Sequence, residues 1–111
     1  MKFKHYLTYD NASDIESLFM NGDYNLSCIV VDETLNNIKT KKKVIPIASI
    51  YSKNDDIIFD LALDREDIEE TLNANLKIME DFEDYERCQR IIEGIEFIKN
   101  PQVKKTKKTK N

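Results

Sequence analysis

Carboxylates are the side chains of this 111-residue sequence with the clearest capacity for chemistry. Asp32-Glu33 and Asp55-Asp56 fall at expected strand ends, and Asp60 falls within an expected strand. Oxygen ligands of this kind bind Mg²⁺ in many proteins. Carboxylates are also common in turns without a metal, and neither zinc-ligand spacing nor a glycine-rich phosphate loop accompanies these. The sequence therefore predicts no metal site and no cofactor.

The one histidine and the two cysteines are the other candidates for catalysis. His5 shares the expected inward face of an alternating segment with Phe3 and Leu7, which favours a packed or hydrogen-bonded role over that of a general base. Cys28 and Cys88 lie within apolar runs and lack metal-ligand spacing, as is typical of buried reduced thiols. We therefore expect no catalytic residue, and a protein that is not an enzyme.

Charge is distributed unevenly along the chain. Residues 1–54 carry 7 basic and 6 acidic side chains, residues 55–96 carry 4 and 15, and residues 97–111 carry 6 and none. An acidic middle followed by a basic end is typical of a chain that contacts another macromolecule. Lysine far outnumbers arginine, and isoleucine and asparagine are abundant, which suggests a low-GC bacterium or its phage as the source.

The length fits one small domain, which we place at residues 1–100, followed by a disordered basic tail at residues 101–111. A domain of this size buries a modest core, so a partner or a homodimer would add to its stability. The sequence shows no secretory signal pattern and no apolar run of the roughly 20 residues that a membrane span needs. We therefore expect a cytoplasmic protein without membrane contact.

The first half of the chain predicts strands around one short helix. Residues 2–9 alternate as a strand does, and Ser13 and Glu16 form a capping-box pattern at the start of a helix of about two turns. Asn21-Gly22 supplies the left-handed stop. Residues 24–32 read as a buried strand because Cys28 begins a continuous apolar run.

Two further strands and a helical hairpin follow. Residues 39–52 predict a strand that is bulged or at an edge near Pro46, and residues 56–63 predict the next strand. Residues 64–99 predict two amphipathic helices, the first capped by Asp64, with Leu76 and Ile92 among the buried positions. The predicted fold class is α+β: a small antiparallel sheet of about four strands, a short N-terminal helix and a C-terminal helical hairpin.

Residues 68–98 contain a motif in which Asp84-Tyr85-Glu86 forms an acidic-aromatic-acidic turn. Cys88, Ile91 and Ile95 follow at small and aliphatic positions. This segment resembles the UVR-type helical hairpin, the interaction module of the excision-repair proteins UvrB and UvrC. Gln89 and the pair Ile92-Glu93 depart from the family pattern. The resemblance implies protein–protein contact without catalysis, and the alternative is an ordinary helical hairpin that packs on the protein's own sheet.

The leading functional prediction is a small protein-binding regulator or inhibitor that docks a partner with a basic surface. An acidic surface speeds association with such a partner, and salt weakens that attraction. The alternative is that the carboxylates only keep the outer side of the hairpin hydrated and bind no partner. The expected partner-binding residues are Glu80, Asp81, Glu83, Asp84, Glu86 and Glu93.

A second hypothesis is a nucleic-acid-associated accessory protein, because lysines contact phosphates without sequence preference. The tail could equally fold back on the acidic helices or only confer solubility. The lysines that this hypothesis uses are Lys41, Lys42, Lys43, Lys104, Lys105, Lys107, Lys108 and Lys110.

Overall fold

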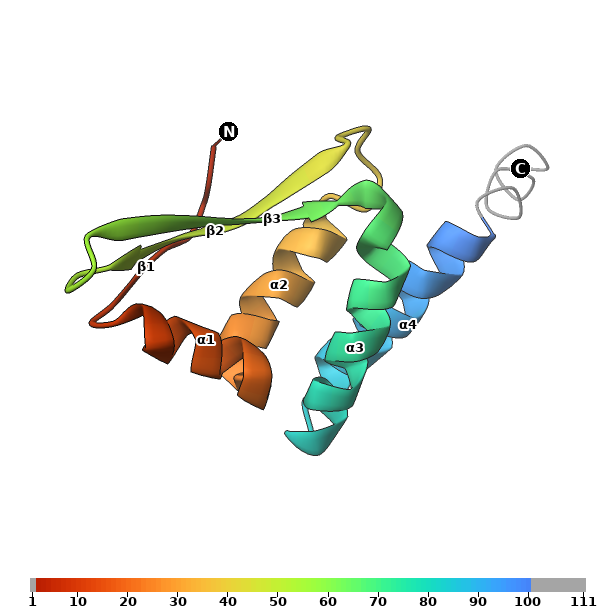
Figure 1. Ribbon diagram of the computed structural model, residues 1–111. Coiled ribbons are helices and arrows are strands. Elements are labelled where there is room, and N and C mark those ends of the chain that lie inside the picture. The colour runs from red at the N-terminus through yellow and green to blue at the C-terminus, as the bar shows by residue number, and fades with distance from the viewer. Residues whose placement is uncertain (1, 101–111) are drawn as a thin grey trace.

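Three strands form one mixed sheet in the computed structural model, which describes residues 2–100 (Figure 1). β1 (Tyr6–Tyr9) runs parallel to β2 (Val44–Ser52), and β2 pairs antiparallel with β3 (Ile57–Asp64), in the order β1-β2-β3. The α+β class is confirmed, whereas the expected antiparallel sheet of about four strands is wrong. The first strand is also shorter than expected, because it begins at Tyr6 and not at residue 2.

The missing strand is a helix, α2 (Tyr24–Asn36). Asp23 caps it, since the Asp23 side chain accepts a hydrogen bond from the Leu26 amide at 2.9 Å. α2 packs against β2 and against both helices of the hairpin, so its apolar residues are not confined to one stripe. A continuous apolar run fits a buried strand and an enclosed helix equally well. Because α1 and α2 form a crossover connection between β1 and β2, β2 runs parallel to β1.

The N-terminal helix, α1 (Ala12–Asn21), begins slightly earlier than expected. Its capping residue is Asn11, whose amide donates to the Asp14 carboxylate at 3.2 Å, so the expected Ser13 cap is wrong. Gly22 ends α1 with a φ of 65°, as the Asn21-Gly22 pair predicts. Only glycine takes this left-handed conformation at little cost.

The expected helical hairpin is present at the C-terminal end of the described chain. A 3₁₀ turn (η1, Arg65–Asp67) leads into α3 (Ile68–Asp81), which is joined by a tight turn to α4 (Tyr85–Lys99). Asp64 precedes the 3₁₀ turn and its side chain makes no capping hydrogen bond, so the expectation that Asp64 caps the first hairpin helix is wrong. Asp84 caps α4 by accepting from the Arg87 amide at 3.2 Å.

The helices all lie on one face of the sheet, and the core fills the space between them (Figure 1). A bulge in β2 between Pro46 and Ala48 lets Ile45, Ile47 and Ala48 all reach this face. β1 pairs only with Ser49–Ser52, so Pro46 lies where β2 has a neighbour on one side alone. The prediction of a bulge or an edge at Pro46 is therefore confirmed.

α4 is rotated about its own axis relative to the orientation that the sequence predicts. Cys88, Ile91 and Gly94 face inward, whereas Ile92 is 45% exposed, so the expectation that Ile92 is buried is wrong. A Cβ at Gly94 would lie only 2.6 Å from Cδ2 of Leu35. Glycine therefore sets the line along which α4 approaches α2, and a hydrophobic stripe cannot reveal a contact made by a residue without a side chain.

Among the described residues, none of the helices is both long and apolar enough to cross a bilayer. The predicted basic tail at residues 101–111 lies outside the described residues.

Two adjacent residues of α4 test this rotation. Ile91 is fully buried, so Ile91→Ala should lower the free energy of unfolding by about 2–5 kcal/mol. Ile92→Ala, the matched control, should lower it by less than about 0.5 kcal/mol. Urea unfolding of both variants checks this, and equal losses would contradict the observed orientation of α4.

Candidate functional site

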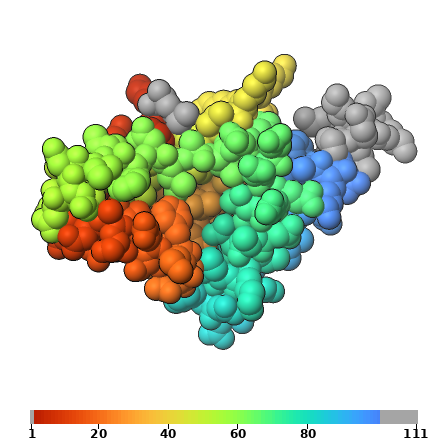
Figure 2. All heavy atoms as spheres, in the orientation of Figure 1, coloured from red at the N-terminus to blue at the C-terminus, as the bar shows by residue number. Residues whose placement is uncertain are grey.

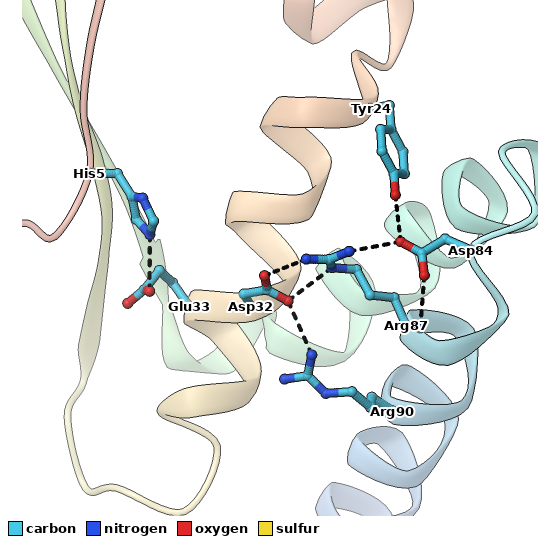
Figure 3. A network of polar contacts seen from close by, with 7 residues as sticks. All are labelled: His5, Tyr24, Asp32, Glu33, Asp84, Arg87 and Arg90. Atoms are coloured by element: carbon cyan, nitrogen blue, oxygen red, sulfur yellow. Dashed lines mark hydrogen bonds and ion pairs between the residues drawn. The ribbon is translucent and has the colours of Figure 1, made fainter.

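His5 and the two cysteines lie among groups that hydrogen-bond or bury their side chains. The His5 Nε2–H donates to the Glu33 carboxylate at 3.1 Å, which ties the N-terminal segment to α2 (Figure 3). The Cys88 thiol is buried, and burial, followed by the charges of Glu80 and Asp84, raises its pKa. A raised thiol pKa lowers the thiolate fraction, so Cys88 is a weak nucleophile. Cys28 is a half-buried free thiol.

The carboxylates considered as metal ligands go to separate places. Asp55 accepts from the Ser52 hydroxyl at 2.7 Å and from the Ala12 amide at 2.8 Å, and these hydrogen bonds lower its pKa. Asp60 accepts from the Ser49 hydroxyl at 3.0 Å. Asp32 instead pairs with arginines of α4. These groups serve turns and helix contacts, and they do not converge on one point.

Three other carboxylates do come together, at the start of the hairpin. Oxygens of Asp64, Glu66 and Asp67 lie within 4.8 Å of one another, and all three residues are exposed. The sequence did not predict this cluster because η1, the 3₁₀ turn that brings the three side chains together, has no strong sequence signal. Exposed acidic groups often gather without binding an ion, so the cluster alone does not indicate a metal site.

Arg87 joins α4 to α2 through charged hydrogen bonds to two aspartates (Figure 3). Its guanidinium donates to both carboxylate oxygens of Asp32, at 3.0 and 2.7 Å, and to Asp84 at 2.8 Å. The Tyr24 hydroxyl donates to the same Asp84 oxygen at 2.7 Å. Arg90 adds a longer contact to Asp32 at 3.3 Å. Bidentate arginine–carboxylate pairs fix both distance and orientation.

The pKa shifts of this network follow from its hydrogen bonds. The bond from Tyr24 and the contact with Arg87 lower the Asp84 pKa, and the same bond raises the Tyr24 pKa to about 12. The two carboxylates raise the pKa of Arg87 above its ordinary value. These groups therefore stay in one charge state across physiological pH, and the network holds the helices together without moving protons.

Most of the expected partner-binding residues lie in solvent. Asp84 is the exception, because its side chain is only 11% exposed and is held by Tyr24 and Arg87. The other five are exposed and, with the exposed side chains of Tyr85 and Ile92, define a surface that we call the acidic face. The five carboxylates are Glu80, Asp81, Glu83, Glu86 and Glu93.

Apolar side chains lie among these carboxylates. Tyr85 is 66% exposed and Ile92 is 45% exposed. The two lie seven residues apart, or about two helical turns, so they occupy the same side of α4. Glu86 and Glu93 follow them with the same spacing. Because the sequence predicts Ile92 to be buried, this exposed pair is not among the expected partner-binding residues.

The expected nucleic-acid lysines of the described chain lie in the loop before β2. Lys41, Lys42 and Lys43 are exposed there. In the same loop, the Lys39 Nζ lies 5.3 Å from the ring centroid of Phe97, near the end of α4. The loop therefore lies beside the point where α4 leads into the basic C-terminal segment, whose lysines fall outside the described residues.

Comparisons with protein-family models, with curated proteins and with solved structures found no match to this chain.

The network predicts a pH dependence of stability. The folded-state pKa of Asp84 lies below its ordinary value of 3.8, so its contribution is present above that value and is lost as pH falls through the folded pKa. The free energy of unfolding should therefore decrease below about pH 5, and less steeply in Asp84→Asn than in the parent protein. Urea unfolding across this range measures the difference, with exposed Asp81→Asn as the control. Parallel profiles for the parent and Asp84→Asn would contradict the assignment.

Proposed function

We propose that this protein is a non-catalytic regulator or inhibitor that binds another protein through the acidic face. The observation that carries the proposal is the pair Tyr85 and Ile92, which are exposed two turns apart and bordered by Glu86 and Glu93. Protein interfaces commonly place an aromatic and an aliphatic anchor inside a polar rim. The arrangement therefore supports a docking surface over a merely solvated helix.

The partner that best fits this face is basic. The carboxylates of the α3–α4 turn produce a field that speeds encounter with a cationic surface and weakens as salt rises. Arg87 holds α4 against α2 before any partner arrives, so little conformational entropy is lost on docking. The resemblance to the UVR-type hairpin also supports binding to another protein. The abundance of lysine, isoleucine and asparagine supports a low-GC bacterium or its phage as the source.

Quantitative affinity capture from an extract of the native host tests the proposal. The bait is the full chain, and the test variant combines Tyr85→Ala with Ile92→Ala, both of which leave the core untouched. A basic protein should be captured by the parent and reduced at least tenfold by the variant, because interface anchors contribute about 2 kcal/mol or more when truncated. The matched control is Tyr6→Ala, at a residue that is 73% exposed on the other face of the sheet.

Three results would count against the acidic face. The first is capture that is unchanged in the double alanine variant. The second is capture that persists when Glu80, Asp81, Glu83 and Glu86 are replaced by their amides and the salt concentration is raised. Loss of binding in the Tyr6→Ala control would place the interface on the sheet and contradict the proposal.

One observation favours the nucleic-acid hypothesis as a second candidate. The contact between Lys39 and Phe97 brings the loop of Lys41–Lys43 beside the last turns of α4, the helix that precedes the lysine-rich segment in sequence. Under this hypothesis, the same phosphates bind both groups of lysines. Glu66 and Glu69 also lie near this end of α4, which weakens a continuous basic surface.

A gel-shift assay with random duplex DNA separates the two candidates. If the tail binds phosphates, removing residues 102–111 should abolish retardation. The five lysines would also give a log–log salt slope of up to about −4, since each neutralised phosphate contributes roughly −0.9. We expect weak retardation that does not depend on the tail. Tight, tail-dependent retardation at moderate salt would reverse the order of the two functions.

A further inference from the structure

The sheet ends in an open strand. In the order β1-β2-β3, none of the strands formed by residues 2–100 lies on the side of β3 away from β2, so backbone N–H and C=O groups on that side lack ladder partners within this part of the chain. β3 is eight residues long and contains neither proline nor glycine, and the bulge of this pair lies on β2. Proteins usually protect such edges with short strands, prolines or bulges. The other edge strand, β1, is only four residues long, whereas β3 is twice that length and has neither a proline nor a bulge of its own.

An apolar groove lies directly beneath this open edge. Its volume is about 310 Å³, and it is bounded by α1, α2, β3 and α3. Figure 2 shows the hollow between α1 and α3, below β3. Among the described residues that line it, Asp23 is the only charged one. Its apolar lining includes Leu18, Leu26, Val30, Leu61, Leu63 and Ile78.

The two faces of β3 differ in chemistry. Leu61 and Leu63 point toward the groove, on the helix-covered side of the sheet. Asp60 and Asp64 alternate with them and project from the uncovered side, where both are exposed. Side chains of an added strand follow the same alternation. A segment paired with β3 would therefore set every second side chain into the groove and the others beside aspartates.

We infer that the open edge of β3 binds an extended segment of a partner protein as a fourth strand, with aliphatic side chains alternating with lysine or arginine. The aliphatic side chains fill the groove between α1 and α3. The cationic ones lie beside Asp60 and Asp64, because opposite charges on adjacent strands attract. Backbone hydrogen bonds along β3 supply affinity, and the alternating side chains supply specificity. This surface lies apart from the acidic face and does not depend on the proposed function.

A second copy of this chain fits the edge poorly. Antiparallel pairing of β3 with itself, centred on Asp60, would set two aspartates opposite each other. Pairing centred on Ala62, two residues further along β3, leaves Asp60 and Asp64 of both copies on the same uncovered face. β3 has no lysine or arginine to balance their charge. Like charges on facing strands are destabilising. Charge complementarity therefore favours a basic segment over self-association.

A synthetic peptide of four Lys-Val repeats, blocked at both ends, tests the inference with the full chain. Titration followed by amide NMR shifts should show saturable binding, with the largest changes along β3 and the lining of the groove. Ala74→Trp fills the groove from an exposed position of α3 and should weaken binding at least tenfold. Asn73→Trp, the adjacent exposed residue that does not line the groove, should bind like the parent.

Two further comparisons separate strand addition from simple charge attraction. N-methylation of either all valine or all lysine amides blocks one edge of the peptide. One methylated peptide should therefore lose binding while the other retains it. Asp60→Asn with Asp64→Asn should weaken binding several-fold at low salt, whereas Glu86→Gln with Glu93→Gln should not.

Several results would overturn the inference. These are the absence of saturable binding, equal binding by both methylated peptides, and no effect of Ala74→Trp. Dimerisation of the parent that excludes the peptide would make a second copy the occupant. Binding that appears only after residues 102–111 are removed would make the chain's own tail the occupant. Either outcome would refute the assignment to a partner segment.

Discussion

The bridge from Arg87 to Asp32 is the interaction on which the rest of the structure depends. It joins α4 to α2 across 55 positions of sequence and also holds Asp84, the capping residue of α4. Two contacts therefore fix α4: the Arg87 bridge near its start and the close approach of Gly94 to Leu35 further along. With both satisfied, Ile91 faces inward, and Tyr85 and Ile92 face solvent. The candidate binding surface is a consequence of how α4 is held.

Local sequence signals predicted the elements whose environment is simple. The hairpin helices each have one buried side, so their helical period is visible, and Gly22 ends α1 as its conformational freedom predicts. α2 was assigned as a strand because it is enclosed by the sheet and two helices, which removes the polar stripe that marks a helix. That one error also changed the direction of β1 and the number of strands, since both depend on the crossover.

The sequence predicted the candidate site residues whose position depends only on the preference of charged side chains for water. Five of the six expected acidic residues are exposed, as glutamate and aspartate usually are. Asp84 is held internally because its partners, Tyr24 and Arg87, come from different elements, and the Tyr24 contact spans 60 positions of sequence. The open edge of β3 and the groove below it depend on strand order and helix placement, which the sequence did not supply. The two proposals thus assign basic partners to separate surfaces, one on the sheet and one on the hairpin.

A double-mutant cycle on Asp32 and Arg87 tests most directly whether this bridge fixes the hairpin. Free energies of unfolding are measured for Asp32→Ala, Arg87→Ala, the double variant and the parent at neutral pH and moderate salt. We predict a coupling energy of about 1–2 kcal/mol, because the contact is bidentate and partly shielded from water. Effects that add to within about 0.3 kcal/mol would show that the two side chains do not stabilise each other. That result would contradict the central role of the bridge.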